Sequence, residues 1–275
     1  MHLDLHLHSI CSDGTRSPEA IVEEAGAAGL HAISITDHDT TAGVEPARRA
    51  GRHAGVVVIS GCELTCSMAG HDLHLLGYGV DPAHRALADF TGRMQAMRRD
   101  RIGEIVRRLQ ALGVTISESD VVLPPGNAAA GRPHVAEALV RLGVVAGIQE
   151  AFSRFLSDAG PAAVPARGPD VRDGIEAVHA AGGIAVWAHP GQDDVVHVPA
   201  LAAAGLDGVE AYRPGAAPVL TQSLEQVARD CDLVVSGGSD WHGGTAVLGA
   251  WFVTDRHVPA LLDRLGLDRD GKELS

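Results

Sequence analysis

Histidine and acidic residues, whose side chains bind divalent metal ions, follow the short apolar runs of this sequence again and again. In His6-Leu7-His8 the two histidines are two residues apart, so on a strand both imidazoles point to one face and can share a metal ion. Asp240-Trp241-His242 repeats this spacing with a carboxylate and an imidazole. A single histidine of this kind is usually a hydrogen-bonded structural residue, but the recurrence favours a metal site. The complete set is His6, His8, Asp13, Asp37, His38, Asp39, Glu63, His74, His189, Glu210, Asp240 and His242.

The elements that must position this set are predicted from apolar runs rich in β-branched residues, which alternate with helical patterns. Strands are predicted at residues 2–6, 31–36, 56–60, 73–78, 183–188, 208–211, 233–236 and 250–253. Helices are predicted at residues 18–28, 44–53, 171–181, 198–204 and 218–229. This alternation predicts an α/β fold with a mostly parallel sheet, closed or nearly closed into a barrel. Catalytic side chains of such barrels lie at the carboxyl ends of the strands, where the set falls.

The segment 81–165 departs from this alternation, because it carries little strand signal. A long amphipathic helix is predicted at residues 85–112, and shorter helices at 132–142 and 146–156. The loop 123–131 between them is rich in proline, glycine and alanine. We therefore predict an inserted helical cap subdomain at 81–165, which covers one side of the barrel mouth, and a barrel made of residues 1–80 and 166–275.

The composition is that of an ordinary globular enzyme, with 45% hydrophobic and 21% charged residues in 275. The net charge of −13 argues against a broad surface for long nucleic acid, but not against a small nucleotide drawn in by metal ions and arginines. The four cysteines suggest no disulfide framework, and no signal peptide or membrane-spanning run is found. These features predict a cytoplasmic enzyme, and they do not indicate an oligomeric state.

Six motifs, in order along the chain, resemble those of the polymerase and histidinol phosphatase (PHP) family of phosphoesterases. They are His6-Leu-His8-Ser-Ile-Cys-Ser-Asp13-Gly, Thr36-Asp37-His38-Asp39-Thr40, Gly61-Cys-Glu63, His74-Leu-Leu-Gly77-Tyr, Ala188-His189-Pro190 and Gly238-Ser-Asp240-Trp-His242-Gly. The family commonly has phenylalanine where Trp241 stands, a departure that leaves the ligating residues intact. The resemblance implies a distorted, TIM-like (β/α)7 barrel with up to three metal ions.

The resemblance also implies which residues bind these ions. The first would be held by His6, His8, Glu63 and Asp240, the second by Asp13, His38 and His242, and a third by Glu63 as a bridge with His74 and His189. Mixed nitrogen and oxygen ligands do not choose among manganese, zinc and iron. We assign Asp37, His189 and His242 to the catalytic group, with Asp37 as a hydrogen-bond partner rather than a ligand. In this scheme a hydroxide that bridges two metal ions attacks phosphorus.

The segment Gly131-Arg132-Pro133-His134 resembles the subgroup that acts on small nucleotides, including nucleoside monophosphates and 3′,5′-bisphosphates. Pro133 suits the first turn of a helix, which places Arg132 and His134 at a helix N-terminus that favours anions. Arg132 is interpreted as a phosphate clamp, with an exposed arginine on the cap surface as the alternative. His134 and Arg213 are further candidate substrate contacts.

Other functions remain open at this point. Within the same family, the chain is either a phosphatase for small nucleotides, a histidinol-phosphate phosphatase, or an enzyme that trims short RNA from its 5′ end. A non-catalytic, metal-stabilised module is a reading from another class, which the intact set of ligands disfavours. A metal-dependent amide or ester hydrolase also fits, because a barrel and metal ions alone do not fix the reaction.

Overall fold

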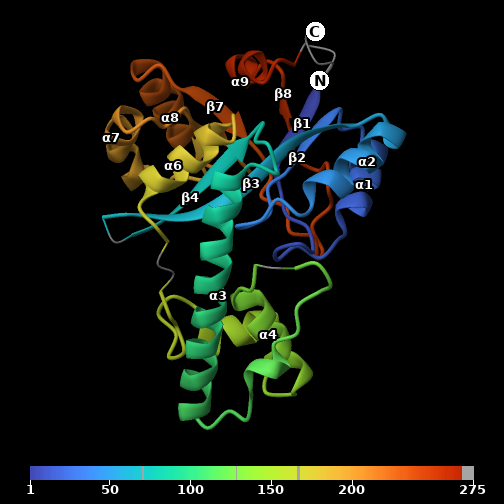
Figure 1. The fold of residues 1–275 in the computed structure, drawn as a ribbon, viewed down its shortest axis with the longest axis vertical. Coiled ribbons are helices and arrows are strands. Elements are labelled where there is room, and N and C mark those ends of the chain that lie inside the picture. Colours follow the sequence, from blue (N-terminus) through green and yellow to red (C-terminus); the bar gives the residue numbers. More distant parts are fainter. Residues whose placement is uncertain (70, 128, 166–167, 268–275) are drawn as a thin grey trace.

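The fold was analysed in a computed structural model, which describes residues 1–69, 71–127, 129–165 and 168–267. Its centre is one eight-stranded sheet with the strand order β7-β6-β5-β4-β3-β2-β1-β8 (Figure 1). The strands are β1 (His2–Leu7), β2 (Ala32–Ile35), β3 (Val57–Met68), β4 (His71–Tyr78), β5 (Ile184–Trp187), β6 (Gly208–Tyr212), β7 (Val234–Gly237) and β8 (Val253–Thr254). A bridge between Leu7 and Trp241 brings the β7 end of the sheet back to β1, so the barrel is nearly closed. This confirms the predicted α/β barrel.

The sheet is less regular than a succession of βα units would make it. Strands β1 to β3 run parallel, as do β5 to β7, but β4 is antiparallel to both of its neighbours. The predicted third strand was expected to end at Ser60, whereas β3 runs on to Met68 and pairs with β4 along its second half. Gly61 is a point of close packing and not a turn, because a Cβ there would lie 2.3 Å from Ser34 Oγ of β2.

Helices cover the barrel on the outside and begin at recognisable signals. They are α1 (Pro18–Ala27), α2 (Val44–Ala54), α6 (Val171–Ala180), α7 (Val198–Ala203), α8 (Pro218–Asp230) and α9 (Pro259–Arg264). Helix α1 starts with Pro18 after Ser17, whose side chain accepts a hydrogen bond from Ala20 N–H. Asp170 caps α6 in the same way. The apolar faces of these helices pack on the strands, which are buried almost throughout.

The segment between β4 and β5 is helical, as predicted. It contains α3 (Arg85–Ala111), η1 (Glu118–Asp120), α4 (Arg132–Arg141), α5 (Ile148–Ala151) and a single π-helical turn, η2 (Phe152–Leu156). The predicted helix 146–156 is thus divided in two. Helix α3 extends away from the barrel with α4 beside its far half (Figure 1). Its first half packs on the barrel through Leu87 and Phe90, while its second half joins α4 in a separate hydrophobic cluster through Ile105 and Leu109.

Helix α3 therefore belongs to two cores, which ties the helical segment firmly to the barrel. The division at residues 81 and 165 stays a prediction. None of the helices in the described ranges is long and apolar enough to cross a membrane.

Candidate metal centre

The predicted ligands lie together at the carboxyl-terminal mouth of the barrel, although they come from strands far apart in sequence. His6 lies in β1, with His8 just after it, and His38 follows β2. The remaining ligands lie in β3 and β4, after β5 and β7, and in the turn after β1; they are Glu63, His74, His189, Asp240, His242 and Asp13. An isolated parallel bridge between His38 and Glu63 joins the β2 end to β3.

Glu63 is the centre of this arrangement. Its side chain is 1% exposed. Ring nitrogens lie 3.0 to 3.3 Å from its carboxylate oxygens and belong to His6, His8, His38, His74 and His189. Burial opposes ionisation of Glu63, but the surrounding imidazoles hold its pKa well below the usual range. The centre of the site is therefore a carboxylate shared by five histidines.

Three groups of side chains in the described residues have ligand atoms close enough to hold one ion each. The groups are His6, His8, Glu63 and Asp240; His8, Asp13, His38 and His242; and His38, Glu63 and His74. The first is the set that the resemblance implied, and the second adds His8 to the expected set. His189 lies beside the third, with Nε2 3.1 Å from Glu63 Oε1 and 3.3 Å from His74 Nδ1. All nine candidate ligands thus converge.

The unpaired atoms of the site support cations as its occupants. Buried ligand atoms without a hydrogen-bond partner in the described part of the chain include His6 Nε2, His8 Nε2, Asp13 Oδ1, His38 Nδ1 and Glu63 Oε2. Leaving so many polar atoms buried and unpaired is costly, whereas divalent ions take such nitrogen and oxygen atoms as ligands. Burial lowers the pKa of His38, which favours the neutral imidazole, whereas nearby carboxylates raise the pKa of His6 and His8 in the absence of metal. The residues present fit a metal centre.

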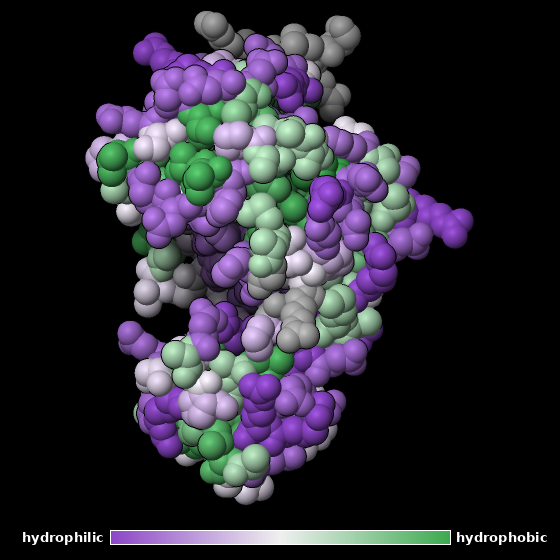
Figure 2. Space-filling model, turned by 90° about the vertical axis from the view of Figure 1, so that its left-hand side faces the viewer, coloured by the Kyte–Doolittle hydropathy of each residue, from purple (hydrophilic) through white to green (hydrophobic). Residues whose placement is uncertain are grey.

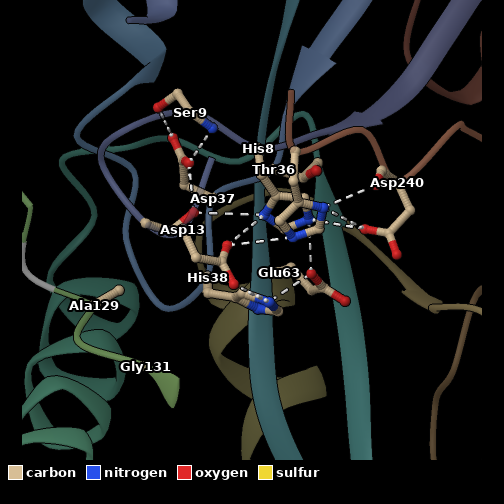
Figure 3. A network of polar contacts seen from close by, with 12 residues as sticks. His8, Ser9, Asp13, Thr36, Asp37, His38, Glu63, Ala129, Gly131 and Asp240 are labelled. Carbon is tan, nitrogen blue, oxygen red and sulfur yellow. Dashed lines mark hydrogen bonds and ion pairs between the residues drawn. The ribbon is translucent and has the colours of Figure 1, made fainter. Parts of the chain in front are cut away.

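Asp37 lies behind this centre. Its carboxylate accepts hydrogen bonds of 2.7 Å from Ser9 N–H and the Ser9 hydroxyl (Figure 3). It accepts a third, also of 2.7 Å, from the Ser12 hydroxyl. Burial raises the pKa of Asp37 above its usual value, while these hydrogen bonds act in the opposite direction. The side chain fixes the turn that carries Asp13, as a hydrogen-bond partner of the site would.

Glu210, which the sequence placed at a strand end without a role, connects two of the ligands. Its Oε1 lies 2.9 Å from His6 Nδ1, and its Oε2 accepts a hydrogen bond of 2.8 Å from His189 N–H. A proton on His6 Nδ1 leaves Nε2, the nitrogen that faces Glu63, free to coordinate. The signal that would have revealed this role is the contact itself, between residues 204 positions apart.

The turn at His189 is held in a backbone conformation that non-glycine residues rarely adopt. His189 has φ 39° and Asp240 has φ 54°. Arg213, a predicted substrate contact, donates hydrogen bonds of 2.6 Å to His189 O and 3.1 Å to Pro190 O. Its guanidinium therefore supports the His189 turn from the carbonyl side, while Glu210 supports it from the amide side.

A pocket of about 390 Å³ separates the metal-ligand residues from the helical segment. Figure 2 shows a hollow bordered by hydrophilic side chains between the two. Asp13, His38 and His74 line it on the barrel side, and Arg101 and Arg132 on the helical side. Arg132 thus lines the same pocket as three of the candidate ligands.

His134, a predicted substrate contact, lies away from the pocket. It is buried, and its Nδ1 accepts a hydrogen bond of 3.1 Å from Gly131 N–H. Its Nε2 lies 3.3 Å from Asn127 Nδ2. The ring therefore fixes the start of α4 and does not line the pocket.

Comparison with known proteins identifies relatives of this chain. The model of the PHP domain matches residues 4–117. A 5′-3′ exoribonuclease of Haemophilus influenzae is 34% identical, over 87% of this chain and 89% of the relative. A 3′,5′-nucleoside bisphosphate phosphatase of Chromobacterium violaceum is 30% identical, over 88% and 87%. The solved structure of a Bifidobacterium adolescentis protein, assigned as a metal-dependent phosphoesterase, is 34% identical and superimposes with a TM-score of 0.86, each chain covered to 98%. The chain belongs to the PHP family of metal-dependent phosphoesterases.

Proposed function

We propose that this protein hydrolyses phosphate esters of small nucleotides, such as AMP or nucleoside 3′,5′-bisphosphates, with two or three bound manganese, zinc or iron ions. The observation that carries the proposal is Glu63, a buried carboxylate shared by overlapping groups of metal ligands beside an arginine-lined pocket. The names of the relatives, a bisphosphate phosphatase and an exoribonuclease, support a nucleotide as the substrate.

Some of the side chains are proposed to bind the metal ions, and others hold these ligands in place. The proposed ligands are His6, His8, Asp13, His38, Glu63, His74, His189, Asp240 and His242. Bound divalent ions supply charge neutralisation at the phosphoryl oxygens and activation of a water molecule. Glu63 belongs to two of the candidate ligand groups, so its negative charge would offset the repulsion between ions held there. Glu210 and Asp37 hold the histidines and the turn that carries Asp13 in place.

Proton transfer to the leaving group requires a side chain at the open edge of the centre. His242 is 37% exposed, with its Nε2 3.3 Å from Asp13 Oδ1, and His189 is 33% exposed. Both border the solvent, whereas His6 and His8 are fully buried. We assign this transfer to His242 or His189, as an alternative to metal binding by that side chain.

The helical segment binds the rest of the substrate. Arg132 lines the pocket and is our candidate for a phosphate contact. Arg213 acts through the His189 turn, and His134 acts through the start of α4, so we propose both as positioning residues.

Removal of 5′-terminal nucleotides from short RNA is a second candidate. The observation that favours it is the length of the pocket, which Arg98, Arg101 and Arg108 line along α3. Arg98 and Arg108 are separated by roughly 15 Å along the helix axis, at 1.5 Å per residue. This is more room than one phosphate needs.

Phosphate release from purified protein tests the proposal directly. Protein loaded with manganese, zinc or iron is assayed with AMP, a nucleoside 3′,5′-bisphosphate, histidinol phosphate and a 5′-phosphorylated oligoribonucleotide. We expect hydrolysis of the nucleotides, its loss on chelation, and its recovery when metal is restored. Elemental analysis is expected to give two or three ions per chain. Hydrolysis of histidinol phosphate alone, or full activity after the chelator has removed all metal, contradicts the proposal.

A further inference from the structure

The helical segment contacts the barrel through few hydrogen bonds, and these are concentrated near two proposed metal ligands. Within the described part of the chain, hydrogen bonds from 85–165 to the barrel occur in two clusters only. In the first, Arg98 of α3 binds the turn after β2, which carries His38. In the second, Asn127 of the loop before α4 binds the turn after β1, which carries Asp13.

The first cluster is built on Asp39, the residue that follows His38. Arg98 Nε lies 2.6 Å from Asp39 Oδ2, and Arg98 Nη2 donates a hydrogen bond of 2.8 Å to Thr65 Oγ1. Asp39 is fully buried and accepts hydrogen bonds of 2.8 Å from the Thr65 N–H and hydroxyl. Gln95 of the same helix donates a hydrogen bond of 2.9 Å to Asp39 O. Because loss of one partner from a buried ion pair is costly, α3 is firmly fixed to this turn.

The second cluster is built on the side-chain amide of Asn127. Its Nδ2 donates a hydrogen bond of 3.0 Å to Ile10 O and another to Ser12 O, the carbonyl just before Asp13. Its Oδ1 accepts a hydrogen bond of 2.9 Å from Ala129 N–H, so the NH2 end of the amide faces the turn. In Figure 3 Ala129 lies on the same side of the centre as Asp13.

The positions of His38 and Asp13 depend on contacts of this kind more than the positions of the strand ligands do. Glu63 and His74 lie within β3 and β4, whose pairing fixes the backbone. His38 and Asp13 lie outside the strands, in turns. Next to His38, Asp39 has φ 50°, a conformation that non-glycine residues keep only where other contacts hold it. The helical segment supplies part of this support.

Both braced ligands belong to one metal group, which consists of His8, Asp13, His38 and His242. We infer that Arg98 and Asn127 are positioning residues for this group, and that the helical segment and an ion held there stabilise each other. Coupling of this kind is reciprocal, so the affinity that the segment adds to the ion is returned as stability of the docked segment. The inference rests on the metal binding in the proposed function, and it adds a role for the helical segment in holding an ion.

Manganese binding tests the inference without any substrate. Chelator-treated protein is dialysed against graded concentrations of Mn²⁺, and bound metal is measured by elemental analysis. In Asn127→Ala we expect one ion to bind about ten- to a hundredfold more weakly, and the others to bind as in the wild type. Arg98→Lys keeps the charge but not the fork of N–H groups, and it should weaken the same ion. Arg99→Ala, which alters an exposed arginine of the same helix, is the matched control.

Two results overturn the inference. One is an unchanged affinity for every ion in both variants, and the other is equal weakening of every ion, the pattern of a general loss of stability. Asn127→Ala leaves no charge unpaired, so it should fold even if Arg98→Lys does not. A wild type that binds no metal refutes the proposed function together with this inference. A wild type that binds two or three ions, with variants that bind them equally well, refutes the inference alone.

Amide hydrogen exchange tests the reverse direction of the coupling. We expect manganese to slow exchange in the wild-type peptide that contains Asn127 and Ala129. Asp13→Asn should abolish this slowing, because Asp13 belongs only to the braced group. Asp240→Asn should retain it, because Asp240 belongs only to another group. Exchange that manganese leaves unchanged in the wild type, or slows equally in Asp13→Asn, overturns the mutual stabilisation.

Discussion

The barrel mouth and the helical segment meet at one pocket, but their side chains are held in place by different kinds of contact. At the barrel mouth His6, His8 and Glu63 are almost completely buried, and each contacts other side chains of the site. On the helical side Arg101 and Arg132 reach the pocket from the surfaces of helices and are oriented by backbone carbonyls. The first arrangement fixes atoms to a few tenths of an ångström, as metal coordination requires. The second leaves long side chains that can follow the shape of a ligand.

This contrast indicates a division of labour. In the function that we propose, the strand ends of the barrel carry the reaction. The segment between β4 and β5 would then carry recognition, and we expect changes at its Arg132 to alter the choice of substrate without disturbing the ligands. Substitutions at the barrel mouth should therefore reduce metal binding and turnover, whereas those of Arg132 and Asp158 on the helical side should change substrate binding. The following experiments test this difference from the largest effect to the smallest.

Glu63→Gln should have the largest effect. Glutamine keeps the shape of the side chain but removes the charge at the point where the ligand groups overlap. We expect the metal content to fall. We expect kcat/KM to fall on the order of a thousandfold, which corresponds to a rise of about 4 kcal/mol in the activation free energy. Circular dichroism should show an intact fold. Wild-type metal content and turnover in this variant would show that Glu63 does not hold the ions.

Glu210→Gln should have a smaller effect on the same side of the pocket. Its carboxylate contacts His6 Nδ1 and His189 N–H, and partners of this kind change metal affinity by roughly ten- to a hundredfold. The measurement is the dissociation constant for manganese, determined calorimetrically, in addition to activity. Glu176→Gln removes the same charge from the exposed face of α6 and serves as the control. Equal affinities in the two variants would mean that Glu210 only fills space.

The two sides also differ in how much the sequence alone could predict. The strands and the convergence of the candidate ligands were accessible because strand ends of a barrel meet, so residue type and position together indicate a site. The extent of β3 was not accessible, because the pairing of its second half with β4 and the close packing of Gly61 against Ser34 are tertiary contacts. Arg101 was missed for a related reason. Which of the many arginines of α3 faces a pocket depends on how α3 packs on α4 and on the barrel.

On the helical side, Arg132→Ala should leave metal content and thermal stability nearly unchanged. Loss of a charged hydrogen bond to phosphate costs about 1.5–3 kcal/mol, which corresponds to a tenfold to hundredfold loss of kcat/KM on the best nucleotide substrate. Arg132→Lys should recover part of this loss, since an ammonium group supplies charge but not a two-pronged contact. Unchanged kinetics in the alanine variant would assign Arg132 to the surface of the helical segment.

The smallest expected effect is tighter substrate binding in Asp158→Asn. Asp158 Oδ1 lies 2.5 Å from Arg132 Nη1, and its side chain is 94% exposed, so its carboxylate competes with a substrate phosphate for the same guanidinium. An exposed ion pair contributes about 0.2–1 kcal/mol, and Asp158→Asn should therefore tighten binding of adenosine 3′,5′-bisphosphate about 1.4- to 5-fold at low salt. The gain should shrink as ionic strength rises, because exposed charges are screened. Asp173→Asn, which removes a charge from the exposed face of α6, controls for the change in net charge. A structural role for the pair predicts weaker binding and lower thermal stability in Asp158→Asn, whereas competition predicts tighter binding that disappears when Arg132→Ala is added. The double variant thus decides whether the Asp158 carboxylate stabilises the helical segment or competes with a substrate phosphate for Arg132.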